Sequence, residues 1–197
     1  MKKSSSHSKH QNQVRIIGGD CRGRKLSFHS AEGLRPTPDI VREKLFNWLG
    51  QDLTGQTVLD LFAGSGALGL EAASRNARQV VLVENNRQTA QQLRQNIQTL
   101  QLEQTEVVVG EGLAYLQQTS LHFDTVFLDP PYTWQDWQKL FEYLSRCLND
   151  GASVYLEAGK LPGWPSAFEI YREGKAGMSR FVLLKYHLQP ESSAMNA

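Results

Sequence analysis

The sequence predicts an α/β fold built on a mostly parallel, doubly wound sheet, and three observations lead to this prediction. From residue 57 onward, short apolar runs typical of buried strands alternate with longer segments of helical periodicity. A glycine-rich turn joins the first of these strands to its helix, as at the ligand-binding edge of such sheets. The last two strand segments have no helical period between them, so the chain is expected to close as an antiparallel hairpin at one sheet edge.

The first fifty residues are predicted to form a tail, a hairpin and a helix. Residues 1–13 are mainly Ser, Lys, His and Gln, which predicts a disordered tail. Two short strand-like runs, 14–19 and 23–28, flank a glycine turn and indicate a β-hairpin. A helix is expected from Thr37 as its N-cap and Pro38 as its first residue to about Leu49. We therefore predict an N-terminal unit over 14–50.

A catalytic or binding domain is predicted over residues 51–188. Its strands are expected at 57–62, 79–84, 106–109, 123–128, 152–157, 168–173 and 179–186. Its helices are expected at 66–75, 87–100, 113–118 and 134–148. Trp134 and Trp137, at helical spacing, are predicted to pack in the core, and residues 189–197 to form a second disordered tail.

Composition excludes several classes of protein. The 197 residues are 40% hydrophobic and 21% charged, as in globular proteins that bury a core. No apolar run approaches the ~20 residues of a membrane span, and the N-terminus lacks the apolar segment of a secretory signal. Cys21 and Cys147 have no metal-type spacing, and the five histidines are scattered. We therefore expect a cytoplasmic protein with free thiols, no metal site and no membrane association.

The charge is unevenly distributed along the chain. Residues 1–50 hold ten Lys or Arg and four acids, whereas the remainder holds 11 and 16. A basic end on a mildly acidic body favours contact with a polyanion, and the alternative is a solvated surface. Nucleic acid is the favoured partner, because the basic residues lie among glycines and apolar residues. Those predicted to contact RNA are Arg15, Arg22, Arg24, Lys25 and Arg35.

A stiff corner follows the apolar run that ends at Leu128. In Asp129-Pro130-Pro131-Tyr132 the two prolines remove N–H donors, so the corner presents acceptors, and Tyr132 adds a flat face. Such a corner suits a planar group with an exocyclic NH2, whose hydrogens the acceptors take while its ring stacks on tyrosine. The alternative is a turn that only ends a strand.

The glycine turn indicates which cofactor lies opposite this corner. Gly64-Ser65-Gly66-Ala67-Leu68-Gly69 matches the dinucleotide pattern GxGxxG, and Glu84 could accept hydrogen bonds from a ribose. Asp60, just before the turn, would repel a pyrophosphate and attract an ammonium group. S-adenosylmethionine carries an ammonium group and a ribose but no phosphate. The alternative for Asp60 is a carboxylate that caps loop amides.

These segments resemble class I, Rossmann-like methyltransferases that modify exocyclic amines. The segments at 15–19, 22–26, 34–37 and 41–49 further resemble the bacterial RsmD family, and the similarity covers about residues 14–187. The resemblance implies a seven-stranded sheet and an S-adenosylmethionine-dependent enzyme, with S-adenosylhomocysteine as product. It implies methylation of N2 of guanine 966 in 16S rRNA, within the small (30S) ribosomal subunit or its assembly intermediate. The cofactor residues implied are Thr37, Asp60, Phe62, Ala63, Gly64, Ser65, Gly66, Glu84, Glu111, Gly112 and Leu113.

The expected mechanism is in-line displacement on a base that has left its stack. Asp129 and the carbonyl of Pro130 would accept the two amine hydrogens, and Tyr132 would stack on the base. The alternatives are an adenine-N6 DNA methyltransferase and a non-catalytic RNA-binding protein of the same fold. A dehydrogenase would leave Asp60 and the corner unexplained. A monomer is expected, and whether protein-free rRNA suffices as substrate stays open.

Overall fold

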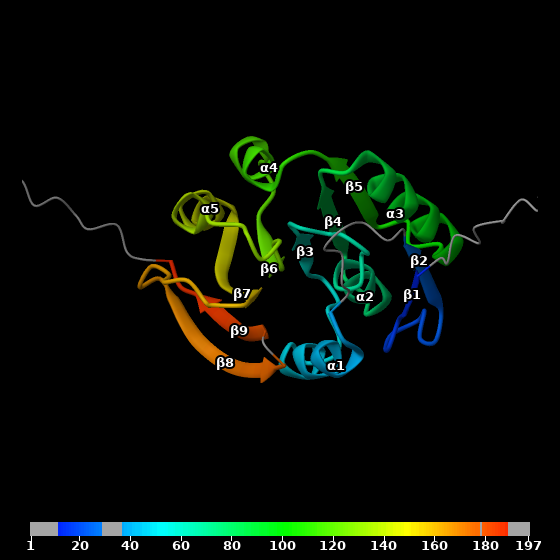
Figure 1. Cartoon of the computed structure of the whole chain (residues 1–197), viewed down its shortest axis with the longest axis horizontal. Coiled ribbons are helices and arrows are strands. Elements are labelled where there is room, and N and C mark those ends of the chain that lie inside the picture. Colours follow the sequence, from blue (N-terminus) through cyan, green and yellow to red (C-terminus); the bar gives the residue numbers. More distant parts are fainter. Residues whose placement is uncertain (1–11, 29–36, 178, 189–197) are drawn as a thin grey trace, which may run out of the picture.

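The computed structural model describes residues 12–28, 37–177 and 179–188. Its centre is a seven-stranded sheet in the order β5-β4-β3-β6-β7-β9-β8, with helices on both faces (Figure 1). The strands are β3 (Thr57–Asp60), β4 (Gln79–Glu84), β5 (Thr105–Val109), β6 (Phe123–Leu128), β7 (Leu148–Ala158), β8 (Phe168–Ala176) and β9 (Ser179–Tyr186). All neighbours pair in parallel except β7 with β9 and β9 with β8. The predicted fold class is confirmed.

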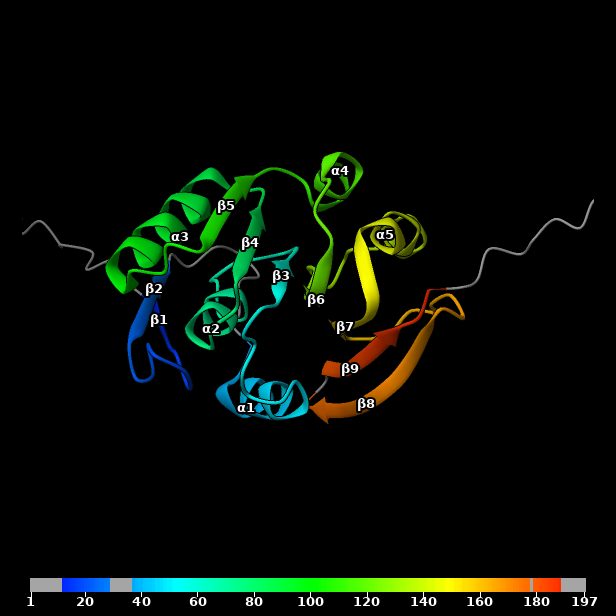
Figure 2. The same cartoon turned by 180° about the vertical axis from the view of Figure 1, so that it is seen from behind.

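Two helical layers cover the sheet. The helices are α1 (Asp39–Trp48), α2 (Gly69–Ser74), α3 (Arg87–Leu100), α4 (Gly112–Gln118) and α5 (Trp137–Leu144), followed by a 3-10 turn at Ser145–Cys147. Figures 1 and 2 show α1, α2 and α3 on one face and α4 and α5 on the other. Among the described residues, no helix has the length and apolar character needed to cross a membrane.

Alternation along the strands divides the apolar core between the two faces. In β4, Val80 and Leu82 pack towards α1, α2 and α3, whereas Val81 and Val83 pack towards α4 and α5. Strands buried on both faces are typical of parallel sheets and explain the continuous apolar runs in the sequence. Trp134 and Trp137 pack edge to face at 4.8 Å against the second core, as predicted, and both stay partly exposed.

Four elements have the bounds that the sequence predicted, namely β4, α3, β6 and β9. Helix α3 has both end signals: the Asn86 side chain accepts from the amides of Gln88 and Thr89, and Gln101 closes the helix in the left-handed region at φ 58°. Such local caps define ends without help from the rest of the fold.

Several boundaries were wrong by a few residues. Helix α2 begins at Gly69, not at residue 66, and β3 ends at Asp60, because the intervening residues form the glycine turn. Helix α5 begins at Trp137, not Trp134, and ends at Leu144. Strand β7 therefore starts at Leu148, earlier than the predicted residue 152, and has an irregular register against β6.

The N-terminal hairpin is shorter than predicted. Its arms are β1 (Asn12–Arg15) and β2 (Lys25–Phe28), so Asn12 and Gln13 belong to a strand and not to the predicted tail. The residues between the arms cross α2, and Ser27 exchanges two hydrogen bonds with Asn96 of α3. The rest of the tail predicted at 1–13, and the tail at 189–197, lie outside the described residues. The division near residue 50 stays a prediction.

A buried ionic network attaches this segment to the sheet domain. Glu71 of α2 accepts from the backbone amides of Ile17 at 2.8 Å and Gly18 at 2.7 Å. The same carboxylate pairs with Arg42 at 3.2 Å and with Arg75 at 2.9 Å. The guanidinium of Arg42, with no exposed side-chain surface, also donates to the carbonyl of Thr37. The network therefore joins the hairpin, α1 and α2.

Candidate active site

Four acidic residues gather at the carboxyl ends of adjacent parallel strands. Asp60 ends β3, Glu84 ends β4, Asp129 follows β6 and Glu157 lies near the end of β7. Strand β3 pairs with both β4 and β6, and β6 pairs with β7, so the four residues share one edge of the sheet. This is the edge at which open α/β sheets bind their ligands.

Asp60 and Glu84 organise the glycine turn. Oδ2 of Asp60 accepts from the Gly69 amide at 2.9 Å, so the capping alternative for Asp60 is present in the structure. Glu84 accepts from the Gly64 amide at 2.9 Å and from the Asn86 amide at 2.7 Å. The carboxylates thus hold both ends of the turn, while Glu84 keeps a partly exposed side chain.

Close backbone approach explains the glycine at position 66. Its φ of 77° lies in the left-handed region, where residues with a Cβ are strained. A Cβ there would also lie 2.6 Å from a methyl carbon of Leu93 in α3. Gly66 is therefore required by the backbone conformation of the turn and by the packing of α2 and α3 side chains against it.

Burial and mutual repulsion raise the pKa values of two carboxyl groups at this edge. Burial, together with the nearby charge of Glu84, raises the pKa of Asp60 to about 7. Burial also raises the pKa of Asp129 to about 8, with added repulsion from Glu157 and Asp60. A cation bound at this edge would favour the ionised carboxylates and lower both pKa values. The acidic side chains therefore fit a positively charged ligand and oppose a pyrophosphate.

The corner after β6 brings a partly buried carboxylate close to an exposed aromatic ring. Asp129 is partly buried and receives a hydrogen bond from the Thr37 hydroxyl at 3.3 Å. The side chain of Tyr132 is 76% exposed, and its hydroxyl lies 2.9 Å from Oγ of Ser179 in β9. Its ring lies against Gly159, where a Cβ would be only 3.3 Å away. Tyr132 thus presents an anchored aromatic face.

The role predicted for Thr37 as a helix N-cap was wrong. Helix α1 starts at Asp39, Pro38 occupies the N-cap position, and no side chain caps the helix. The Thr37 hydroxyl is instead directed to Asp129, while its carbonyl accepts from Arg42 at 3.2 Å. Thr37 therefore belongs to the candidate site through Asp129, and its predicted contact with a cofactor stays a prediction.

The remaining predicted cofactor residues lie around the same edge. Phe62, Ala63, Gly64 and Ser65 belong to the turn after β3, and Phe62 packs edge to face with Trp134 at 5.4 Å. Glu111 precedes α4, is exposed, and accepts from Nδ2 of Asn85 at 3.2 Å. Gly112 and Leu113 begin α4.

The basic residues of the hairpin lie apart from the corner. Figures 1 and 2 show β1 and β2 beside α3, whereas Asp129 and Tyr132 follow β6 in the middle of the sheet. Arg15 is paired with Asp39 at 3.3 Å, and Arg24 donates to the Thr99 carbonyl at 2.9 Å. Arg22 and Lys25 are exposed. Arg35 lies outside the described residues.

Two residues of the site were missed in the sequence. Glu157 is 7% exposed, accepts from the Tyr155 hydroxyl at 2.8 Å, and acts on the charge of Asp129. Ser179 anchors Tyr132 from the far side of β7. Neither has a local signal, because each enters the site through the pairing of β7 with β6 and β9.

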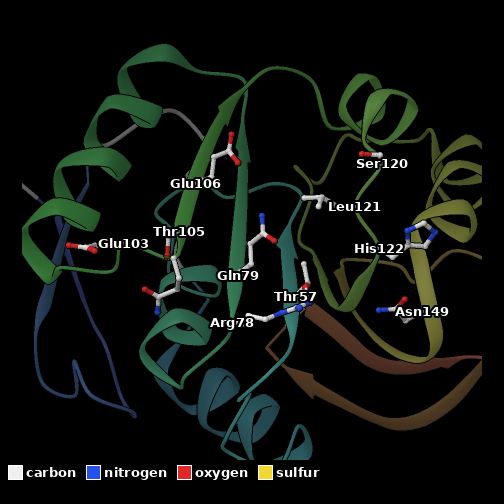
Figure 3. A pocket seen from close by; sticks show the side chains of 11 residues that line it. Thr57, Arg78, Gln79, Glu103, Thr105, Glu106, Ser120, Leu121, His122 and Asn149 are labelled. Carbon is white, nitrogen blue, oxygen red and sulfur yellow. Dashed lines mark hydrogen bonds between the residues drawn. The ribbon is translucent and has the colours of Figure 1, made fainter.

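A polar groove of about 760 Å³ lies elsewhere, at the amino ends of the strands. Figure 3 shows its lining side chains, among them Thr57, Gln79 and Thr105, which begin β3, β4 and β5. Arg78 donates to the Thr57 hydroxyl at 2.7 Å, so part of its polar lining is already satisfied. Its position opposite the ligand-binding edge separates it from the candidate site.

Comparison with known proteins adds independent information. The model of the family described as "Conserved hypothetical protein 95" matches residues 14–185. The chain is 41% identical over 187 residues to ribosomal RNA small subunit methyltransferase D of Escherichia coli K12, covering 92% of this chain and 94% of the relative. The solved structure of yhhF from Escherichia coli superposes with a TM-score of 0.83 at 38% identity, over 90% of this chain and all of that one.

A more distant structure shows how widely the fold is shared. The tRNA m1G37 methyltransferase of M. jannaschii superposes with a TM-score of 0.65, over 92% of this chain and 58% of that one. At 14% identity, this likeness shows the fold alone. The doubly wound sheet with an antiparallel β9 is thus the class I methyltransferase fold.

Proposed function

The chain belongs to the ribosomal RNA small subunit methyltransferase D family, and on that premise we propose that it methylates N2 of a guanine in 16S rRNA. The methyl donor is S-adenosylmethionine, and the target is guanine 966 of the small subunit or its assembly intermediate. The observation that carries the proposal is the corner at Asp129, Pro130 and Tyr132, beside an acidic, glycine-lined edge. Family membership suggests the substrate, and the corner suggests the amine.

The acidic edge supports the choice of methyl donor. When bound, S-adenosylmethionine supplies an electrophilic methyl group on a positively charged sulfur. The pKa values of Asp60 and Asp129 are raised, and a cation close to these side chains would stabilise their ionised forms. Glu84, partly exposed at the end of β4, would accept from ribose hydroxyls. Glu111, Gly112 and Leu113 would line the adenine, and the bare backbone of the turn would allow close approach.

The residues of the corner perform the alignment. A guanine that has left its stack would lie on the exposed face of Tyr132, which Ser179 and Gly159 hold in place. The Asp129 carboxylate and the Pro130 carbonyl would accept the two N2 hydrogens and so orient the nitrogen lone pair. After methyl transfer, the proton that the amine loses would pass to the Asp129 carboxylate, which already accepts one of its hydrogens, or to water.

The N-terminal unit would contact RNA phosphates. Arg22 and Lys25 are exposed, and Arg15 and Arg24 use only part of their hydrogen-bonding capacity in the structure. Arg35 belongs to the same proposed group. A phosphate would compete with the exposed Arg15–Asp39 pair, which contributes little by itself. We propose that the protein acts in the cytoplasm as a monomer.

The experiment uses radiolabelled methyl-S-adenosylmethionine and three acceptors in parallel: small subunits from a strain that lacks this methylation, protein-free 16S rRNA, and DNA. The proposal predicts label in 16S rRNA of the small subunits. Comparison with protein-free rRNA shows how much the assembled particle contributes. Label in DNA alone, recovered as methyladenine, would replace the proposal with an adenine-N6 methyltransferase. Cofactor binding without transfer to any acceptor would favour a non-catalytic RNA-binding protein.

A further inference from the structure

The antiparallel hairpin of β8 and β9 brings unpaired positive charge to the sheet edge that holds Asp60, Glu84 and Asp129. Strand β9 runs antiparallel to β7, so Arg180 lies opposite Ala158, at the end of β7 next to Glu157. Arg180 follows Ser179, whose hydroxyl lies 2.9 Å from that of Tyr132. The start of β9 is therefore tied directly to the aromatic face of the corner.

Two further cations lie around Arg180. In the β8–β9 pairing Lys175 is directly opposite Arg180, so the two side chains project from the same face of the sheet. Lys160 comes two residues after Ala158, beyond the end of β7. All three side chains are exposed. Within the described part of the chain, none of them forms an ion pair or a hydrogen bond.

Like charges directly opposite each other destabilise a sheet, so this arrangement calls for a reason. Protection of an exposed sheet edge explains lysines on edge strands, and β8 is an edge strand. That reason covers Lys175 but not Arg180, because β9 lies between β7 and β8. It does not cover Lys160, which lies outside the sheet. An anion shared by the three cations accounts for all of them.

We propose that Lys160, Lys175 and Arg180 form a second RNA-binding surface, which grips phosphates of the strand that delivers the target base to Tyr132. The inference rests on the proposed function, because it requires an RNA substrate. The inference adds to the proposed function a basic surface beside Tyr132, at the opposite end of the sheet from the basic hairpin β1–β2 (Figure 1). The flipped nucleotide would then have its backbone held on the β7–β9 side as its base enters the corner.

The test compares two double variants with the same loss of charge. Lys175→Ser/Arg180→Ser removes two of the three proposed contacts and leaves Lys160 in place. Arg146→Ser/Arg172→Ser is the control, because Arg146 lies after α5 and Arg172 lies three residues from Lys175, on the part of β8 away from the corner. Binding to a protein-free 16S rRNA transcript is measured by filter retention over a range of salt concentrations. Calorimetry with S-adenosylmethionine checks that both variants keep the cofactor site.

For the first double variant we expect about tenfold weaker RNA binding and a salt slope smaller by about one to two, with unchanged cofactor binding. The control should keep the wild-type slope, and Lys175→Arg/Arg180→Lys should restore it. Equal slopes for the first double variant and the control would overturn the inference, while methylation by the wild type would still support the proposed function. A wild type that methylates no RNA would overturn both.

Discussion

Glu71 and Asp129 are both acidic side chains withdrawn from solvent, yet their partners differ. Glu71 is fully buried between two arginines and accepts from two backbone amides. Asp129 accepts from the Thr37 hydroxyl, and its pKa is raised by burial and by two acidic neighbours, Glu157 and Asp60. The first carboxylate is neutralised by the protein itself, whereas the second has no basic partner among the described residues. The comparison separates charges that hold the fold together from charges kept for a ligand.

The largest effect is expected from removing the carboxylate of Asp129. Asp129→Ala should lower methyl transfer by about a thousandfold, because it removes an acceptor that aligns the amine. Binding of S-adenosylmethionine should persist, as calorimetry would show. The matched control is Asp136→Ala, which removes an exposed carboxylate from the same connection between β6 and α5. Retained activity in Asp129→Ala would remove this residue from the mechanism.

The next largest effect is expected from removing the charge of Glu71. Glu71→Gln keeps the shape of the side chain but leaves Arg75 buried without its counter-charge and leaves Arg42 with Asp39, at 2.6 Å, as its remaining acidic partner. We expect a loss of about 3 kcal/mol in the free energy of unfolding, and a Tm lower by about 10 °C in a scanning calorimeter. Glu142→Gln, which breaks the exposed pair with Arg146, should change stability by less than about 1 kcal/mol. Equal losses in the two variants would contradict the structural role of the network.

Substitutions of Tyr132 should have a smaller effect, and they separate the role of its ring from that of its hydroxyl. Tyr132→Ala should lower kcat/KM by about 10- to 100-fold, since stacking on an aromatic face contributes roughly 1–3 kcal/mol per base. Tyr132→Phe keeps the face and loses only the contact with Ser179, so a loss below about tenfold is expected. Steady-state kinetics with small subunits would measure both. A larger loss in Tyr132→Phe than in Tyr132→Ala would exclude the stacking role.

The last expected effect is a pH dependence of stability. In the folded protein the pKa of Asp60 is raised to about 7 and that of Asp129 to about 8, from 3.8. The folded state therefore binds more protons than the unfolded chain in this window. The stability that this contributes is fully present below about pH 4 and is lost as the pH rises through about 7 and 8.

Thermal unfolding of the cofactor-free protein checks this dependence. The Tm should fall between about pH 5.5 and pH 8.5, and Asp60→Asn should flatten the fall, because the amide does not titrate. Saturating S-adenosylmethionine should also flatten it, since a bound cation favours the ionised carboxylates. A Tm that stays level in the wild type, or falls equally in Asp60→Asn, would contradict the proposed electrostatics.

Local signals explain what the sequence could predict. Helix α3 has its bounds defined by Asn86 and Gln101, and β6 ends in the apolar run Val126-Phe127-Leu128, just before Asp129 and the proline pair. The glycine turn and the corner after β6 are contiguous motifs, so their residues and their sheet edge could be predicted together. Parallel pairing then brought Asp60, Glu84 and Asp129 to one edge, as expected.

Contacts between segments distant in the sequence explain which features could not be predicted. Thr37 has the local pattern of an N-cap, but the competing acceptor Asp129 lies 92 positions away and attracts its hydroxyl. Arg42 is one of ten basic residues near the N-terminus, and only the fold shows that it is buried against Glu71 rather than exposed to RNA. Likewise, the pairing of Lys175 with Arg180 and the anchoring of Tyr132 by Ser179 depend on the register of β9.

The most direct test of the central claim is the chemical identity of the methylated nucleoside. Small subunits methylated with labelled S-adenosylmethionine would be digested to nucleosides and separated by liquid chromatography with mass spectrometry against standards. The account predicts that all label is recovered as N2-methylguanosine, because the acceptors of Asp129 and Pro130 select an exocyclic amine. Label in N1- or N7-methylguanosine, or on a ribose hydroxyl, would contradict it.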